Sequence, residues 1–399
     1  MLRSEVNFCM LTQLLDRSIH LKPFGLKRIF PKMEGRSFSE HRDKYDTTTL
    51  FYDVFRSHDC QHIILIGPKP IGYEKELSAA KFFLEGKKLK VKQRKLKRVH
   101  EIWIKVPVDK EITSLVMEMN NVQVELKVAQ ETSSRFKGKR VLSTLCVDTP
   151  IPWILDWIKF HVVNHGANAV VLFENSIDLE HAQNIHRAIE DADLDIEHEI
   201  VHAPFKYGPP YPHEIKFLQR SILQLVRWKY VQTSEALLFC DIDELIICDD
   251  RQSIFDHVKK SFLGYYMLRG TWIEPATQLA PEKLASIENR RHFMFQYTSN
   301  PPSKTNPKWV AVPSRIPRGM QFKAHGIRPE PKHQALFHPF FSRLRPFLKA
   351  GRMCHFWSIN TSWAKDRQKI EAVDPKKHAL HKDLNAACMA AFSDPRETD

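Results

Sequence analysis

The feature that most constrains this chain is an apolar run, Ala236–Cys248, whose middle holds Asp241, Asp243 and Glu244. The residues on both sides of these acids have the continuous apolar pattern of buried strands. Burying a carboxylate costs several kcal/mol unless a cation, a proton or hydrogen bonds compensate it. The run therefore predicts a strand that delivers acids to a site with a compensating partner, and a metal ion is the simplest partner.

The spacing of the acids suggests how they would act. In an extended segment Asp241 and Asp243 point to the same side, so both can reach one hard divalent ion or its waters. Surface loops also contain isolated Asp-x-Asp pairs, but rarely between two apolar strand-like runs. At the end of a strand in a parallel sheet, the acids would lie where such sheets bind nucleotides. We expect Glu244 to point the other way and to pair with a basic group.

Composition limits the class of protein. The chain has 399 residues, with 60 Lys+Arg against 47 Asp+Glu and a formal net charge of +13. This length predicts two or three domains, and the charge favours anionic partners such as nucleotides, nucleic acid or an acidic membrane surface. Seven cysteines without a CxxC pair indicate reduced thiols. Arg3 and Glu5 interrupt the first apolar residues, so we expect no secretion signal and a cytoplasmic location.

Changes in the apolar pattern of the sequence divide the chain into four predicted parts. Alternating apolar patterns predict short strands at His62–Ile66 and Val99–Val106, and a hairpin that turns at Asn120-Asn121. Helical patterns follow Trp363 and His378 near the end. The predicted parts are an irregular basic lead-in (1–60), a small β-rich domain (61–137), an α/β domain (138–345) and a C-terminal helical segment (346–399), with Arg343 and Arg345 just before it.

One stretch of the β-rich domain, 86–98, is unusually basic. Clustered lysines and arginines can bind anionic lipid headgroups or nucleic acid. The alternation of Lys90, Val91 and Lys92 also fits a strand with one solvated side, which is the more common origin of such a pattern. No aromatic residues are interleaved for stacking on bases, so we expect no nucleic acid partner.

After Gly138 the sequence alternates between strands and helices. Apolar strand patterns begin at Arg140, Ala169, Ile196 and Leu237, and amphipathic helix patterns separate them. This order predicts a doubly wound, mostly parallel, Rossmann-like sheet. Neither a GxGxxG nor a Walker motif is present, which argues against dinucleotides and ordinary NTPase chemistry.

The ordered blocks resemble the GT-A glycosyltransferases of the family 2 and family 92 type. The resemblance covers roughly residues 138–370 and lies in six strings: Trp153–His161, Val170–Asp178, Phe239–Leu245, Lys308–Arg315, Ala324–Ile327 and His355–Trp363. The order of the blocks is more specific than any one of them. One departure is Val147-Asp-Thr-Pro150, where family members carry a basic residue followed by Asn-Glu.

The resemblance implies a GT-A fold and roles for particular residues. Asp241 and Asp243 would hold Mn²⁺ or Mg²⁺, with His325 as the preferred third ligand and His355 as the second choice. Glu274, after a strand-like run, is the expected general base. The nucleotide and its diphosphate would contact the remaining candidates, which are Asp148, Glu174, Asn175, Lys308, Arg315 and His355. Trp272, Trp309 and Trp357 are candidates for stacking on a sugar or base, whereas Trp153 and Trp157 fit a core helix.

The predicted function is a metal-dependent glycosyltransferase that moves a sugar from a nucleotide-sugar, with a UDP-sugar favoured, to a glycan or lipid-linked glycan acceptor, with inversion. The protein would act in the cytoplasm, as a peripheral protein where an anionic membrane surface takes part. Two alternatives remain at this level: a metal-dependent nucleotidyltransferase, and a non-catalytic basic scaffold on a degenerate transferase fold.

Overall fold

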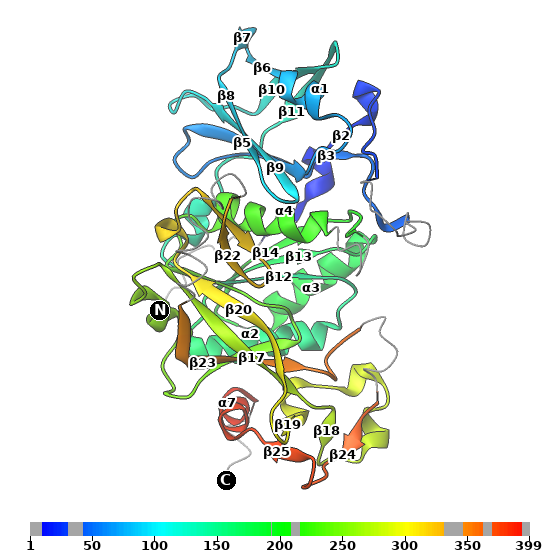
Figure 1. Ribbon diagram of the computed structural model, residues 1–399, viewed down its shortest axis with the longest axis vertical. Helices are drawn as coiled ribbons and strands as arrows, with labels where there is room; N and C mark the ends of the chain where they lie inside the picture. Colours follow the sequence, from blue (N-terminus) through cyan, green and yellow to red (C-terminus); the bar gives the residue numbers. More distant parts are fainter. Residues whose placement is uncertain are drawn as a thin grey trace.

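The computed structural model describes residues 10–30, 43–192, 194–208, 216–330, 346–361 and 369–392. Figure 1 shows three tiers along the long axis: small β-sheets at one end, a large central sheet with helices on both faces, and a third tier formed by later segments. The predicted α/β class is therefore correct. No helix among the described residues is long and apolar enough to cross a membrane.

The central sheet mixes parallel and antiparallel pairing. Within the described residues it has nine strands in the order β1-β14-β13-β12-β15-β20-β17-β23-β16. The first five are mutually parallel, as predicted for the strands after Gly138. The bounds are β1 Met10–Gln13, β12 Arg140–Cys146, β13 Ala169–Glu174, β14 Glu197–His202, β15 Ala236–Phe239, β16 Glu244–Cys248, β17 Tyr265–Ile273, β20 Lys304–Ala311 and β23 Phe347–Phe356.

Helices cover both faces of this sheet because its strands carry apolar side chains on both sides. On β13, Val170 and Leu172 face one core, and Val171 and Phe173 face the other. The first core contains residues of α2, α3, α5 and α7, and the second contains residues of α4. The bounds are α2 Ile151–His165, α3 Leu179–Asp191, α4 Phe217–Leu225, a π-helical turn Val226–Tyr230 that continues α4, α5 Ile254–Lys259 and α7 Lys382–Phe392.

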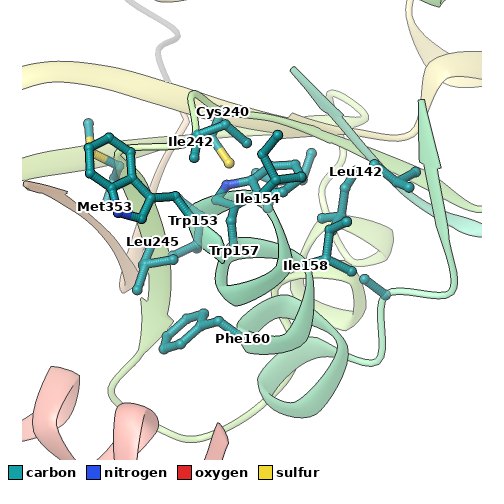
Figure 2. Close-up of a cluster of buried hydrophobic side chains, with 14 of the residues drawn as sticks. Leu142, Trp153, Ile154, Trp157, Ile158, Phe160, Cys240, Ile242, Leu245 and Met353 are labelled. Atoms are coloured by element: carbon teal, nitrogen blue, oxygen red, sulfur yellow. The ribbon is translucent and has the colours of Figure 1, made fainter. Parts of the chain in front are cut away.

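Helix α2 anchors the strand that precedes the acids. Trp153 and Trp157 are buried, as predicted, and Figure 2 shows them beside Cys240, Ile242 and Leu245. Ile242, the residue between the two aspartates, is 6% exposed and belongs to the same core. Burying this side chain holds the segment in place while its polar neighbours remain outside the core.

The same helix completes the edge strand β16. Without such partners, the outer edge of β16 would be a row of unpaired backbone N–H and C=O groups. The Ile246 N–H donates to His161 Nε2 (3.3 Å), and His165 Nε2 donates to the Ile246 carbonyl (2.7 Å). His161 Nδ1 donates to the Trp157 carbonyl, and His165 Nδ1 accepts from the Ile254 N–H. Both imidazoles are therefore neutral, and burial lowers the pKa of His161 to about 3 and that of His165 to about 4.

The N-terminal tier contains two four-stranded sheets among the described residues, in the orders β4-β5-β9-β8 and β11-β10-β6-β7. The predicted hairpin is present, and Asn120 and Asn121 both have positive φ (52° and 61°), which two-residue hairpin turns require. The bounds are β4 Asp53–Arg56, β5 His62–Pro68, α1 Glu74–Ala79, β6 Lys81–Leu84, β7 Lys87–Lys88, β8 Val91–Lys95, β9 Val99–Lys105, β10 Ser114–Met119 and β11 Val122–Lys127.

The lead-in is more structured than the sequence indicates. Met10–Gln13 pairs in parallel with β14 as a strand of the central sheet, and Asp53–Arg56 forms β4. Two further short strands, β2 Ile19–His20 and β3 Thr49–Phe51, pair with each other. The prediction of an irregular stretch is wrong for these segments. The partner of β1 lies far away in sequence, and a local pattern does not reveal such pairing.

Buried charges join the N-terminal tier to the central one. Lys229 Nζ lies 2.6 Å from Asp53 Oδ2, and both side chains are at most 3% exposed. Trp228 Nε1 donates to Glu101 (3.3 Å), and the rings of Trp228 and Trp103 pack edge to face at 4.9 Å. Because these contacts sit within a shared apolar core, the two tiers form one packed body.

The C-terminal prediction needs correction. Phe347–Phe356 is not helical but forms β23, inside the central sheet between β17 and β16. The predicted helix after Trp363 lies partly outside the described residues, and its described part includes the strand Glu371–Ala372. Arg343 and Arg345 lie outside the described residues. The helix expected after His378 is present as α7. The remaining short strands are β18 Ala276–Thr277, β19 Tyr297–Ser299, β21 Met320–Lys323, β22 Gly326–Pro329, β24 Glu371–Ala372 and β25 His378–Leu380.

Candidate functional site

The acids lie in the tight connection between β15 and β16. The Glu244 N–H donates to the Asp241 carbonyl (3.1 Å), and the Asp241 N–H donates to the Glu244 carboxylate (2.8 Å). The segment is therefore a turn and not the extended strand that the Asp-x-Asp spacing suggests. The carbonyl of Ile242 accepts a hydrogen bond from His292 Nε2 (2.8 Å), which fixes the turn from the core side.

A buried lysine compensates two of the acids. Lys308 Nζ lies 2.7 Å from Asp241 Oδ2 and 2.9 Å from Glu244 Oε2, and its side chain has no exposed surface. Burial would raise the pKa of Asp241, but the Lys308 ammonium outweighs it and the pKa is lowered. Burial raises the pKa of Glu244. The predicted basic partner of Glu244 is thus present, and it also holds Asp241.

Strand register places a histidine beside Asp243. His355 on β23 is opposite Glu244 on β16 and opposite Trp272 on β17, so the three residues form a row across the sheet. His355 Nε2 lies 3.1 Å from Asp243 Oδ2, and its Nδ1 lies 3.8 Å from Glu244 Oε1. Burial lowers the pKa of His355, but the charge and hydrogen bond of Asp243 outweigh it, so the pKa is raised.

Aromatic rings continue this row toward solvent. The rings of Trp272 and His355 stack with centroids 4.1 Å apart, and Trp357 stacks on Trp272 at 4.5 Å. Thr305 Oγ1 lies 3.4 Å from His355 Nδ1. Trp309, the third predicted stacking residue, has no exposed surface and packs between Phe239 and Phe322. Only two of the three tryptophans are therefore near the acids.

A hollow of about 150 Å³ opens beside the aspartates. It lies between the carboxyl ends of β12 and β15, which are neighbours in the sheet although the chain leaves β12 toward β13 on the other side. This is a topological switch point, where open α/β sheets bind ligands. The residues around it are Leu145, Cys146, Val147, Thr149, Trp153, Asp241, Ile242, Asp243, Ile359, Asn360 and Thr361.

The side chains of two residues predicted to bind the nucleotide, Glu174 and Asn175, are already hydrogen-bonded to neighbouring loops. Glu174 is fully buried, and its carboxylate accepts from the Asp148 N–H (3.2 Å) and from the backbone and hydroxyl of Ser176. Asn175 Nδ2 donates to the carbonyls of Ala203 (2.6 Å) and Phe205 (2.8 Å). These contacts tie together the loops that follow β12, β13 and β14. Asp148 is exposed on the first of these loops, with a φ of 45°.

The remaining predicted residues fall in different places. His325 is near Asp241, whose charge affects its titration, but its Nδ1 contacts the Pro307 carbonyl (3.2 Å) and burial lowers its pKa to about 4. Glu274 follows β17 and is half-buried, two residues after Trp272. Arg315 Nη1 donates to the Lys259 carbonyl (2.7 Å), beyond the end of β20 that pairs with the start of β15. Arg315 is therefore not part of the acid cluster.

Sequence reasoning missed two neighbours of the acids. Thr305 contacts His355, and burial together with the negative charge of Asp241 raises the pKa of Tyr207. Neither residue lies in a recognisable motif. The strand pattern of 304–311 could have placed Thr305 on β20, but its contact with His355 depends on a strand order that the pattern does not give.

No family model matches the sequence, and no curated protein matches it. Among solved structures, the chain is similar to galactosyltransferase LgtC in complex with donor and acceptor sugar analogs (10% identity, 64% of this chain and 98% of that chain, TM-score 0.30). It is also similar to an active-site mutant of LgtC (11% identity, 64% of this chain, 98% of that chain, TM-score 0.27). At these scores no residue role is transferred to the present chain.

Proposed function

We propose that this protein is a glycosyltransferase that uses a nucleotide-sugar and a divalent cation. The observation that carries the proposal is the meeting of Asp243 and His355 beside a hollow at the switch point of the sheet. Such a position combines charged ligands with a crevice for a nucleotide. The stacked Trp272 and Trp357 supply flat apolar surface of the kind that binds sugars and bases.

The donor atoms fit a divalent cation. One ligand atom each from Asp243, Glu244 and His355 lie within 4.8 Å of one another. Asp243 and His355 are the better ligands, because Lys308 already holds Glu244. A mixed carboxylate and imidazole set suits Mn²⁺. A cation held there would stabilise the negative charge of a departing nucleoside diphosphate.

The protein's own groups would divide the remaining work. Lys308 keeps Asp241 ionised and fixes the turn, so it acts as a positioning residue and not as the diphosphate clasp expected from the sequence. Glu174 positions the Asp148 loop at the mouth of the hollow. Asp148 remains a candidate for hydrogen bonding to the nucleotide base.

Glu274 is the proposed general base for the acceptor hydroxyl, and transfer would then invert the anomeric carbon. Its carboxylate makes no hydrogen bond or ion pair with any described residue, and it follows the strand that carries Trp272. A base must accept the proton directly, so an unoccupied carboxylate beside a sugar-binding surface is suited to this role. The acceptor is expected to be a glycan or a lipid-linked glycan. A cytoplasmic location with contact to an anionic membrane stays a prediction.

A calorimetric titration tests the proposal. UDP, GDP and CMP are titrated into the protein with Mn²⁺ and again with EDTA. We expect one nucleotide, UDP, to bind only with the metal, and the binding to disappear in Asp243→Asn and His355→Asn. Asp249→Asn makes the same chemical change at an exposed residue after β16 and should bind normally. If no nucleotide binds under either condition, the proposal is wrong.

One observation favours a second candidate, a non-catalytic scaffold. Lys308 neutralises Asp241, the first acid of the motif, so the site has a charge balance without any metal. Nucleotide binding that is equally tight in EDTA, with no sugar transfer to any glycan or lipid-linked acceptor, would support the scaffold. Metal-dependent release of UDP from a UDP-sugar would exclude it.

A further inference from the structure

A second cleft lies between the N-terminal and central tiers and shares no residue with the acid site. Its volume is about 320 Å³. One wall is the sheet of β5, β9 and β8, and the other comes from the start and end of the β21–β22 hairpin region. The lining residues are His62, Lys90, Val91, Lys92, Arg94, Trp103, Lys105, Arg318, Gly319 and Glu330.

Strand register gathers cations on the wall of this cleft. Lys92 on β8 is opposite Trp103 on β9, and Lys105 on β9 is opposite His62 on β5. Lys90 and Lys92 are two residues apart, so their side chains share one face of the sheet. Lys90 and Lys92 are exposed, as a solvated strand face predicts, and this face lines the cleft, with Arg318 on the opposite wall.

Two acids beside the cleft share one buried arginine. Arg94 binds both Glu101 and Glu330, and its Nε lies 3.0 Å from Glu330. By contrast, the ammonium groups of Lys90, Lys92 and Lys105 form no ion pair or hydrogen bond with any described residue. The Arg318 guanidinium lies 3.9 Å from the Asp59 carboxylate. The cations that line the cleft thus outnumber the acids beside it.

His62 reports this concentration independently. Its Nδ1 is buried and has no hydrogen-bond partner among the described residues. Burial lowers the pKa of His62, the Asp59 carboxylate raises it, and the charges of Arg318, Lys105 and Lys92 lower it again, so the pKa is lowered overall. The ring packs against Trp103 (centroids 5.5 Å apart), and the Arg318 guanidinium lies 5.6 Å from the same indole. His62 and Trp103 therefore place aromatic rings beside the cations of the cleft.

We propose that this cleft is a binding site for a phosphate-bearing ligand with two or more negative charges. Lysines bind phosphate as point charges, and an arginine adds directed donors. The volume falls in the range of small-molecule sites, which is about 300–1,000 Å³. The site extends beyond the proposed transferase activity, because it needs neither Asp243 nor a metal. The phosphate belongs to a soluble ester or to a lipid headgroup, and the chemistry of recognition is the same.

Titration with inorganic pyrophosphate in EDTA and low salt tests the site. We expect saturable binding that weakens by at least about tenfold in Lys92→Ala/Lys105→Ala, because two of the four cations are lost. Lys87→Ala/Lys88→Ala removes the same charge from β7, outside the cleft, and should change binding by less than about twofold. Asp243→Asn should bind as the wild type does. Absence of binding, or equal weakening in both lysine pairs, would overturn the proposal.

A vesicle assay identifies the source of the phosphate. The wild type and both lysine variants are sedimented with phosphatidylcholine vesicles, with and without phosphatidylinositol bisphosphate. Sedimentation that needs the phosphoinositide, is lost in Lys92→Ala/Lys105→Ala and is displaced by pyrophosphate supports a headgroup ligand. Pyrophosphate binding without sedimentation supports a soluble phosphate ester. Sedimentation that both lysine pairs weaken equally indicates a diffuse charge effect and contradicts a defined site.

Discussion

Two acids at the carboxyl edge of the same sheet, Glu174 and Asp241, have their charges compensated in opposite ways. Glu174 ends β13 and is fully buried, and its donors come from residues at most 26 positions away. Asp241 follows β15, its side chain is 36% exposed, and its cation comes from Lys308, 67 positions away. The first acid is satisfied by its local loops. The second depends on strands of the other half of the sheet.

This difference separates an acid that builds the site, Glu174, from an acid that remains available to a ligand, Asp241. Full burial and three local hydrogen bonds leave the Glu174 carboxylate little capacity for a ligand, so its role is to hold the Asp148 loop. The turn at Asp241–Glu244 instead meets side chains from β20 and β23. Charges compensated by other charges can exchange partners when a ligand arrives, whereas backbone hydrogen bonds cannot be given up without local unfolding. Four predictions test this contrast.

Replacing Lys308 should have the largest effect on stability. Lys308→Met leaves Asp241 and Glu244 without their buried cation, and the free energy of unfolding should fall by about 3–5 kcal/mol. Lys304→Met changes an exposed lysine on the same strand and should cost less than about 0.5 kcal/mol. Urea denaturation measures both. Adding Glu244→Gln to Lys308→Met should recover part of the loss, because one uncompensated charge is removed. Equal stability of the two lysine variants would show that the long-range compensation is unimportant.

Replacing Asp243 should lower activity with little loss of stability. Asp243→Asn keeps the size of the side chain but removes the charge beside His355, so sugar transfer should fall by about 100- to 1,000-fold with little change in unfolding. A coupled assay of UDP release measures turnover. Undiminished turnover in Asp243→Asn would contradict the assignment of Asp243.

The parallel half of the sheet could be predicted because its signals are local. Strands β12, β13 and β15 each have an apolar run of their own, and the intervening helices have their own periodicity. The Asn120-Asn121 turn could also be predicted, since asparagine tolerates the positive φ that both residues adopt. Strands β1 and β23 were missed because pairing with β14 and β17 depends on residues almost 200 and 80 positions away.

The acids are the part of the candidate site that a local motif predicts. The Asp-x-Asp motif is local, and its surroundings are not. The choice of His325 over His355 as a metal ligand followed the order of motifs along the chain, whereas the register of β16, β23 and β17 brings His355 to Asp243. Arg315 was grouped with the site because it ends a matching string, although that string extends past the far end of β15.

Acidic pH should destabilise the contacts that His161 and His165 of α2 make beside the edge strand β16. His161 and His165 have folded-state pKa values of about 3 and about 4, well below the ordinary 6.5, because burial disfavours the charged imidazole. Below pH 6.5 the unfolded chain therefore binds protons that the folded protein does not, so stability falls as pH drops toward 4. Each histidine should contribute about 1–2 kcal/mol of destabilisation at pH 5. Urea denaturation at pH 7 and pH 5 measures this loss, and His165→Gln should make it smaller. An unchanged pH dependence in His165→Gln would contradict a neutral, buried His165.

The smallest effect on nucleotide binding should come from the locally compensated acid, Glu174. Glu174→Gln keeps one carbonyl oxygen but turns an amide NH₂ toward a group that donates, either the Asp148 N–H or Ser176. Leaving one buried donor unsatisfied should lower the free energy of unfolding by about 1–3 kcal/mol. Nucleotide binding should keep its metal dependence and weaken only as far as the Asp148 loop moves. Asp178→Asn, which alters the exposed cap of α3 on the same loop, is the control and should cost only a few tenths of a kcal/mol because Asn also caps helices well. If Glu174→Gln instead abolished nucleotide binding while leaving stability unchanged, Glu174 would be a ligand and the contrast between the two acids would fail.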